Sequence, residues 1–238
     1  MSSSLYQNRQ RARINTQRPC DTPGCPRNRK WTTSLCSQCG DRRTRHGHPK
    51  ALGIRKPEYA PLLKLVRDLF ARLDGSTALR EAEHVIRLAL DPGPERRKKR
   101  SGPGADAYHA WRELSRLQAA KVSPRRALEV SVAIMLYIRE RPAQFPKDAV
   151  MTARAVANAV YRLAPLYMYH YGTTVADHRT NSLKPCAGAL DVLGNRVRVG
   201  LAPFVRNVEA TLAEEKREEN ERRARLYEKL TPTKRKAS

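Results

Sequence analysis

The chain has 238 residues, and 47 Lys or Arg against 23 Asp or Glu give it a formal net charge of +24. It contains no run of about 18 apolar residues, which argues against a membrane-spanning protein. Because counterion release from phosphates supplies most of the non-specific affinity for nucleic acid, the charge predicts a nucleic-acid partner, DNA rather than RNA. A solubilising charge excess and attraction to anionic lipid are the alternatives.

Residues 1–18 carry several arginines and little apolar surface. A segment of this kind cannot bury enough surface to order itself, so the sequence predicts a disordered basic arm. Such an arm is either a frayed terminus or a contact for phosphates. It also lacks the apolar core of a secretory signal, which predicts a cytoplasmic protein whose thiols stay reduced.

Residues 19–50 contain four of the five cysteines, spaced as C-x4-C, ten residues, and C-x2-C. Two short thiol pairs on two turns can close on one tetrahedral ion, so the spacing predicts one structural Zn2+. Because a segment this short has too little core to fold alone, the bound zinc would supply its folding free energy. His46 or His48 in place of one cysteine remains an alternative. The predicted ligands are Cys20, Cys25, Cys36 and Cys39.

Cations surround these thiols. The loop between the two cysteine pairs is basic and carries Trp31, and three arginines follow the second pair. Cationic side chains position a protein on the phosphate backbone without reading bases, so we predict contacts with nucleic-acid phosphates. The predicted contacts in this segment are Arg27, Arg29, Lys30, Arg42, Arg43 and Arg45.

Three stretches of this segment, CDTPGC at 20–25, LCSQCGDR at 35–42 and RHGHP at 45–49, form a recognisable pattern. Together they resemble a small zinc module of many phage and mobile-element proteins, several of which carry an HNH nuclease domain downstream. The family pattern has a His where this chain has Cys39, a change that keeps tetrahedral coordination possible. The resemblance covers only residues 20–50. It implies nucleic-acid association in a bacterial cell, or in the host cell of a phage, and it does not imply cleavage.

An HNH nuclease needs a histidine base close to a second His or Asn and to metal ligands. The one local candidate is Asp177 and His178, followed by Asn181, and neither a second His pair nor a strand pattern surrounds it. We interpret this stretch as a polar loop and expect a non-enzymatic protein. A metal-dependent nuclease and a protein-interaction adaptor are the alternatives.

The rest of the chain has helical periodicity. Residues 57–90 predict a helical hairpin, and residues 105–202 a helical domain in which 127–138 are apolar on nearly every side, as in a central helix. Residues 203–238 predict one long charged helix with a basic tail, through which, as through the helical domain, the protein could bind a partner or itself. The predicted fold is therefore mainly α, with a small N-terminal zinc module.

Between these two helical parts, residues 91–104 predict a basic linker, because Pro and Gly flank five consecutive cations that repel one another. We expect this run to contact phosphates, with a solvated linker as the alternative. Its cations are Arg96, Arg97, Lys98, Lys99 and Arg100.

Overall fold

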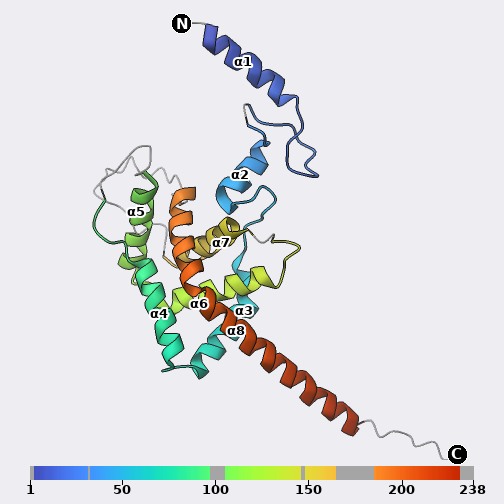
Figure 1. Ribbon diagram of the computed structural model, residues 1–238, viewed down its shortest axis with the longest axis vertical. Coiled ribbons are helices and arrows are strands. Elements are labelled where there is room, and N and C mark those ends of the chain that lie inside the picture. The colour runs from blue at the N-terminus through green and yellow to red at the C-terminus, as the bar shows by residue number, and fades with distance from the viewer. Residues whose placement is uncertain (1–2, 32, 97–104, 146–147, 165–184, 231–238) are drawn as a thin grey trace, which may run out of the picture.

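The computed structural model describes residues 3–31, 33–96, 105–145, 148–164 and 185–230. In these residues helices are the only regular elements, which confirms the mainly α fold (Figure 1). No described helix is both long enough and apolar enough to cross a membrane. The helices are α1 (Ser3–Thr16), α2 (Ser37–His46), α3 (Lys56–Arg72), α4 (Thr77–Leu90), α5 (Ala105–Ala119), α6 (Pro124–Arg139), α7 (Ala149–Tyr161) and α8 (Ala187–Leu230).

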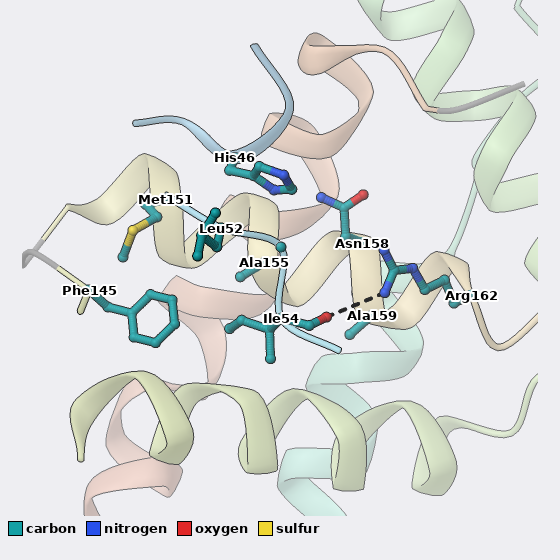
Figure 2. A pocket seen from close by; sticks show the side chains of 10 residues that line it. His46, Leu52, Ile54, Phe145, Met151, Ala155, Asn158, Ala159 and Arg162 are labelled. Carbon is teal, nitrogen blue, oxygen red and sulfur yellow. Dashed lines mark hydrogen bonds between the residues drawn. The ribbon is translucent and has the colours of Figure 1, made fainter. Parts of the chain in front are cut away.

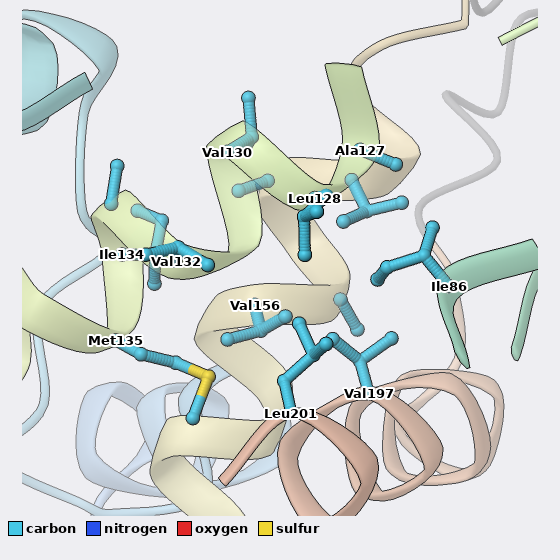
Figure 3. Packing of buried hydrophobic residues seen from close by; sticks show 14 of the residues in the cluster. Ile86, Ala127, Leu128, Val130, Val132, Ile134, Met135, Val156, Val197 and Leu201 are labelled. Atoms are coloured by element: carbon cyan, nitrogen blue, oxygen red, sulfur yellow. The ribbon is translucent and has the colours of Figure 1, made fainter. Parts of the chain in front are cut away.

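Helix α6 lies at the centre of the helical body, as its apolar composition predicts. Its start is defined by Ser123, whose hydroxyl accepts a hydrogen bond from the Arg126 amide at 3.2 Å. Helices α3, α4, α7 and α8 all pack on it. Figure 3 shows Val132 of α6, Val156 of α7 and Leu201 of α8 in the shared core, where each is fully buried. Ser131, also buried there, donates its hydroxyl to the Ala127 carbonyl at 2.7 Å.

Helices α3 and α4 form where residues 57–90 predict them, but they do not make a separate hairpin unit. Their turn is closed by Ser76, which caps α4 through the Leu79 amide at 3.3 Å. The main partner of α3 is α6, while α4 packs on α6 and α8. Phe70 and Ile86, one from each helix, belong to the same core as α6. Their apolar stripes therefore serve one body that also includes much of residues 105–202.

Helix α8 differs from the predicted boundary at residue 203, because it begins at Ala187 and continues to Leu230. Pro203 has no amide hydrogen to donate to the carbonyl of Val199. The helix persists because Leu201 and Val205, on either side of the proline, are both fully buried. The first part of α8 packs on α4, α5 and α7, and its last turns project from the body (Figure 1).

The prediction of disorder for residues 1–18 also differs from the structure, in which Ser3–Thr16 form α1. The segment has no internal proline or glycine and is rich in Arg and Gln, which favour helix even without a buried face. Its last turn is tied to the cysteine segment, because the Asn15 side chain donates to the carbonyls of Trp31 and, at 2.9 Å, Thr33.

Candidate metal centre

The first cysteine pair lies on a loop closed by backbone hydrogen bonds. Pro19 and Asn28 form an isolated antiparallel bridge, and the Cys20 amide donates to the Arg27 carbonyl at 2.8 Å. Within the loop, the Cys25 amide donates to the Thr22 carbonyl at 3.0 Å. Gly24 adopts a φ of 77°, a left-handed conformation that glycine reaches without steric cost. The two thiols are thereby turned to the same side.

The second pair lies at the start of α2. Cys36 is the N-cap residue, and its sulfur accepts a hydrogen bond from the Cys39 amide at 3.4 Å. The Cys36 amide in turn donates to the sulfur of Cys20 at 3.3 Å. Amide donors and the positive end of a helix both favour a thiolate over a thiol. The amides of the C-x2-C turn therefore favour the thiolates of Cys36 and Cys20.

The four sulfurs form one compact group, with all ligand atoms within 4.8 Å of one another. The Cys25 sulfur lies 3.8 Å from that of Cys36 and 3.7 Å from that of Cys39. Four thiolates around zinc at about 2.3 Å would lie about 3.8 Å apart, whereas a disulfide needs about 2.05 Å. All four cysteines are free, and Cys20, Cys36 and Cys39 are buried. The group could therefore hold one metal ion.

The thiols of this group do not share one proton affinity. Burial raises the pKa of Cys20, but hydrogen bonds from Thr22 and from the Cys36 amide outweigh it and lower the pKa to about 6. For Cys39, a hydrogen bond from Thr22 lowers the pKa, but burial and the three neighbouring thiols raise it to about 11. Four thiols this close together cannot all ionise without a cation, because their negative charges repel one another. A divalent cation would neutralise these charges and allow all four to bind it as thiolates.

The two histidines lie apart from this thiol group. His46 ends α2, and its ring lies against Gly53, where a Cβ would come within 3.0 Å of the ring carbon Cε1. The Nδ1 atom of His48 accepts a hydrogen bond from the Lys50 amide at 3.2 Å. The four cysteines thus form the ligand group without help from either histidine.

The cations of the loop between the cysteine pairs have different surroundings. Arg27 and Lys30 are exposed, whereas Arg29 is half-buried, forms an ion pair with Asp21, and donates to the Pro19 carbonyl at 3.0 Å. Arg29 therefore holds the loop together. Trp31 lies beside them with 68% of its surface exposed and a φ of 49°, which is unusual for a bulky residue.

Helix α2 carries the remaining predicted cations of the module and docks on α7. Arg154 of α7 donates to the carbonyls of Arg43 and Thr44 at 2.7 and 2.8 Å while it pairs with Asp191 at 2.6 Å. After the helix, Gly47 approaches the α7 backbone so closely that a Cβ would lie 2.9 Å from the Met151 nitrogen. This docking joins the cysteine segment to the helical body.

The docking of α2 on α7 leaves the three arginines of α2 with different exposure to solvent. Arg43 and Arg45 are exposed and Arg42 is half-buried, and Arg45 lines a cavity together with His46 and residues of α7. In the predicted linker, Arg96 is exposed, while Arg97, Lys98, Lys99 and Arg100 lie outside the described residues. The nuclease candidates Asp177 and His178, with Asn181, also lie outside them.

Sequence reasoning missed Arg55, Asn158 and Arg162, which line the same cavity. They come from the start of α3, from α7 and from the residue after α7, so no spacing in the sequence connects them. Neither a protein-family model nor a curated protein nor a solved structure matches this chain. The function must therefore be argued from the chain's own residues.

Proposed function

We propose that this chain is a nucleic-acid-binding accessory or regulatory protein of a phage or other mobile element, stabilised by one Zn2+ and acting on DNA rather than RNA. The zinc would be held by Cys20, Cys25, Cys36 and Cys39. Zinc fits this donor set because soft thiolates at tetrahedral spacing are its usual structural ligands. When bound, the ion would fix the loop between the two cysteine pairs. With four thiolate ligands the ion would have no open coordination position, so its role would be structural rather than catalytic.

The observation that carries this proposal is a set of exposed cations on the cysteine segment, Arg27, Lys30 and Arg43, which we call the basic face. All three side chains are exposed, and among the described residues none of them has a carboxylate partner. Some cations of the body are paired instead, as Arg125 is with Glu83 at 2.8 Å. Exposed cations without carboxylate partners favour binding to phosphates, from which they release counterions.

Trp31 adds a second kind of contact to this basic face. An indole held in the open beside cations presents a π-face to any unstacked base, and base–aromatic stacking contributes about 1–3 kcal/mol per base without sequence preference. The proposed protein thus binds the nucleic-acid backbone through its cations and stacks Trp31 on a base. Quenching of Trp31 fluorescence by single-stranded but not duplex DNA would identify the stacked form.

The salt dependence of DNA binding tests the basic face. The variant Arg27→Ala/Lys30→Ala/Arg43→Ala removes three charges and leaves the ligand cysteines unchanged. Fluorescence anisotropy over a salt series should show weaker binding, with a log K against log[salt] slope smaller by about 2.7 for duplex DNA or about 2.1 for a single strand. Parallel series with RNA of the same sequence decide between the two nucleic acids.

A matched control separates the basic face from net charge. The variant Lys64→Ala/Arg206→Ala/Lys216→Ala also removes three exposed cations, from α3 and α8. It should keep nearly the wild-type slope. Equal losses in both variants, or binding that does not depend on salt, would show that the basic face is not the contact surface.

The nuclease alternative is tested by a separate experiment, because Asp177 and His178 lie outside the described residues. Plasmid DNA incubated with the zinc-loaded protein and Mg2+ or Mn2+ should stay intact if the role is binding alone. Cleavage that disappears in His178→Ala would replace the proposed role with an enzymatic one.

A further inference from the structure

A second feature of the molecule is a cavity of about 450 Å3 between α2, the start of α3, and α7. Its volume falls in the range of about 300–1,000 Å3 that small-ligand sites occupy. Among the residues that the structure describes, four arginines line it and no Asp or Glu does. The lining arginines are Arg45, Arg55, Arg116 and Arg162.

Only one of these arginines is neutralised by an acidic side chain that the structure describes. Arg116 pairs with the buried carboxylate of Glu113 at 3.0 Å and donates to the carbonyls of Ala164 and Tyr161. Arg45, Arg55 and Arg162 have no carboxylate within ion-pair distance among the described residues. The nearest bond made by the Arg162 guanidinium is to the Ile54 carbonyl, at 3.4 Å (Figure 2).

Figure 2 shows a neighbouring pocket that shares His46, Ile54, Asn158 and Arg162 with this cavity. In it, Asn158 lies next to Arg162, and His46 lies beside Asn158. The Asn158 amide donates to the carbonyls of Arg154 at 2.9 Å and Arg45 at 3.4 Å, which holds α2 and α7 together at this pocket. Burial, and then the positive charges of Arg45 and Arg162, lower the pKa of His46. Among the described lining residues, positive charges therefore outnumber negative ones, although the Glu58 carboxylate accepts from the Arg55 amide.

We propose that this cavity is a binding site for a phosphate monoester, with Arg45, Arg55 and Arg162 as the phosphate ligands. Guanidinium groups bind phosphate through paired, charge-assisted hydrogen bonds, and several of them in one concave site gain most from a dianion. An anion also offsets the cost of gathering like charges at a partly desolvated site. The monoester is carried either by a free nucleotide or by the 5′ end of a nucleic acid. The site does not depend on the role proposed for the basic face.

Pyrophosphate titrated into the full, zinc-loaded chain in a calorimeter is the first test. It should bind the wild type, and Arg45→Ala and Arg55→Ala should each weaken binding by about tenfold or more, the effect of losing a charge-assisted hydrogen bond. The control Arg206→Ala removes one exposed arginine of α8 and should bind like the wild type. It lies 16 residues beyond the cavity residue Leu190, or about 24 Å along the helix.

The pKa of His46, measured by NMR, reports whether the anion binds in this cavity. An anion beside an imidazole favours the protonated ring, so saturating pyrophosphate should raise the pKa of His46 in an NMR titration. Should Arg55→Ala fail to fold, Arg45→Ala and the His46 titration decide. Absence of binding, equal weakening in all three variants, or an unchanged His46 would overturn the proposal.

The source of the phosphate is decided by two further ligands. An oligonucleotide with a 5′-phosphate that binds about tenfold more tightly than its 5′-hydroxyl form supports a nucleic-acid end, whereas binding of a nucleoside monophosphate without that difference supports a free nucleotide. Binding of neither overturns the monoester assignment. The basic-face variant Arg27→Ala/Lys30→Ala/Arg43→Ala should bind pyrophosphate normally, so failure of one proposal is distinguishable from failure of the other.

Discussion

Removal of the metal should unfold the cysteine segment, residues 19–50, and leave the helical body folded. The buried residues of this segment's own cluster are Cys20, Cys36 and Cys39, with Cys25 and Leu35 partly buried against them. Leu35 is the one larger apolar side chain among them, and full burial of such a side chain contributes at most about 3 kcal/mol. Zinc bound by a cysteine-rich module contributes about 10–16 kcal/mol. A zinc ion bound by this group would therefore decide whether the segment folds.

Hydrogen exchange before and after treatment with a zinc chelator measures this directly. Amides of Cys20, Cys36 and Cys39 should lose protection in the metal-free protein, whereas amides of α6 should keep theirs. The body should lose little stability, because Arg154 gives up its bonds to α2 carbonyls but keeps its ion pair with Asp191. Metal analysis should find one zinc per chain before treatment.

A pair of variants serves as the control for the chelator. Cys36→Ser should abolish zinc binding and copy the exchange pattern of the metal-free protein. Cys186→Ser should bind zinc normally, because Cys186 lies outside the thiol group and its neighbour is Asp106 at 3.8 Å. Protection of the cysteine segment that persists without metal would refute the reasoning, since its small core would then suffice.

Three further predictions concern the helical body. Gly194→Ala should cost about 1–3 kcal/mol of stability in chemical denaturation, because its Cβ would lie 2.0 Å from a carbonyl oxygen of α7, whereas Gly40→Ala meets no atom within 4 Å and should be neutral or stabilising. Arg116→Met should lower the free energy of unfolding by about 1–3 kcal/mol, because the buried Glu113 keeps only its pair with Arg112 at 3.1 Å and the carbonyls of Tyr161 and Ala164 lose a donor, and a Glu113→Gln/Arg116→Met double variant should recover part of it. Burial and nearby arginines lower the pKa of His46 below its ordinary 6.5. The free energy of unfolding of the wild type should therefore fall relative to that of His46→Gln as pH drops below 6.5, with no pH-dependent difference above 6.5. The opposite trend in chemical denaturation would contradict this environment.

The metal ligands could be predicted from the sequence because all four lie within 20 residues. Over so short a chain, two turns and the spacing of each pair restrict where the sulfurs can go, and Cys20, Cys25, Cys36 and Cys39 do come together in one group that could hold a metal ion. The choice between cysteine and histidine was harder. His46 stands only seven residues from Cys39, and the docking of α2 on α7 directs its ring to the wall of the cavity instead.

The helices follow from local patterns in the same way, since apolar periodicity and caps such as Ser76 and Ser123 act within a few residues. Helix boundaries were less predictable where packing opposes a local signal. Pro203 is a helix breaker by its own chemistry, but burial of Leu201 and Val205 stabilises the helix on both sides of it.

The sequence by itself thus determined the helical class and the grouping of the four cysteines, because both depend on residues near one another in the chain. Only the tertiary structure decided which cations are exposed and free of a carboxylate partner, and so able to bind an anion. It pairs Arg29 with Asp21, leaves Arg27 and Lys30 exposed, and lines one cavity with arginines more than a hundred residues apart. Charge can be counted from composition, but its field depends on which carboxylates come within a few ångströms, and packing alone sets those distances.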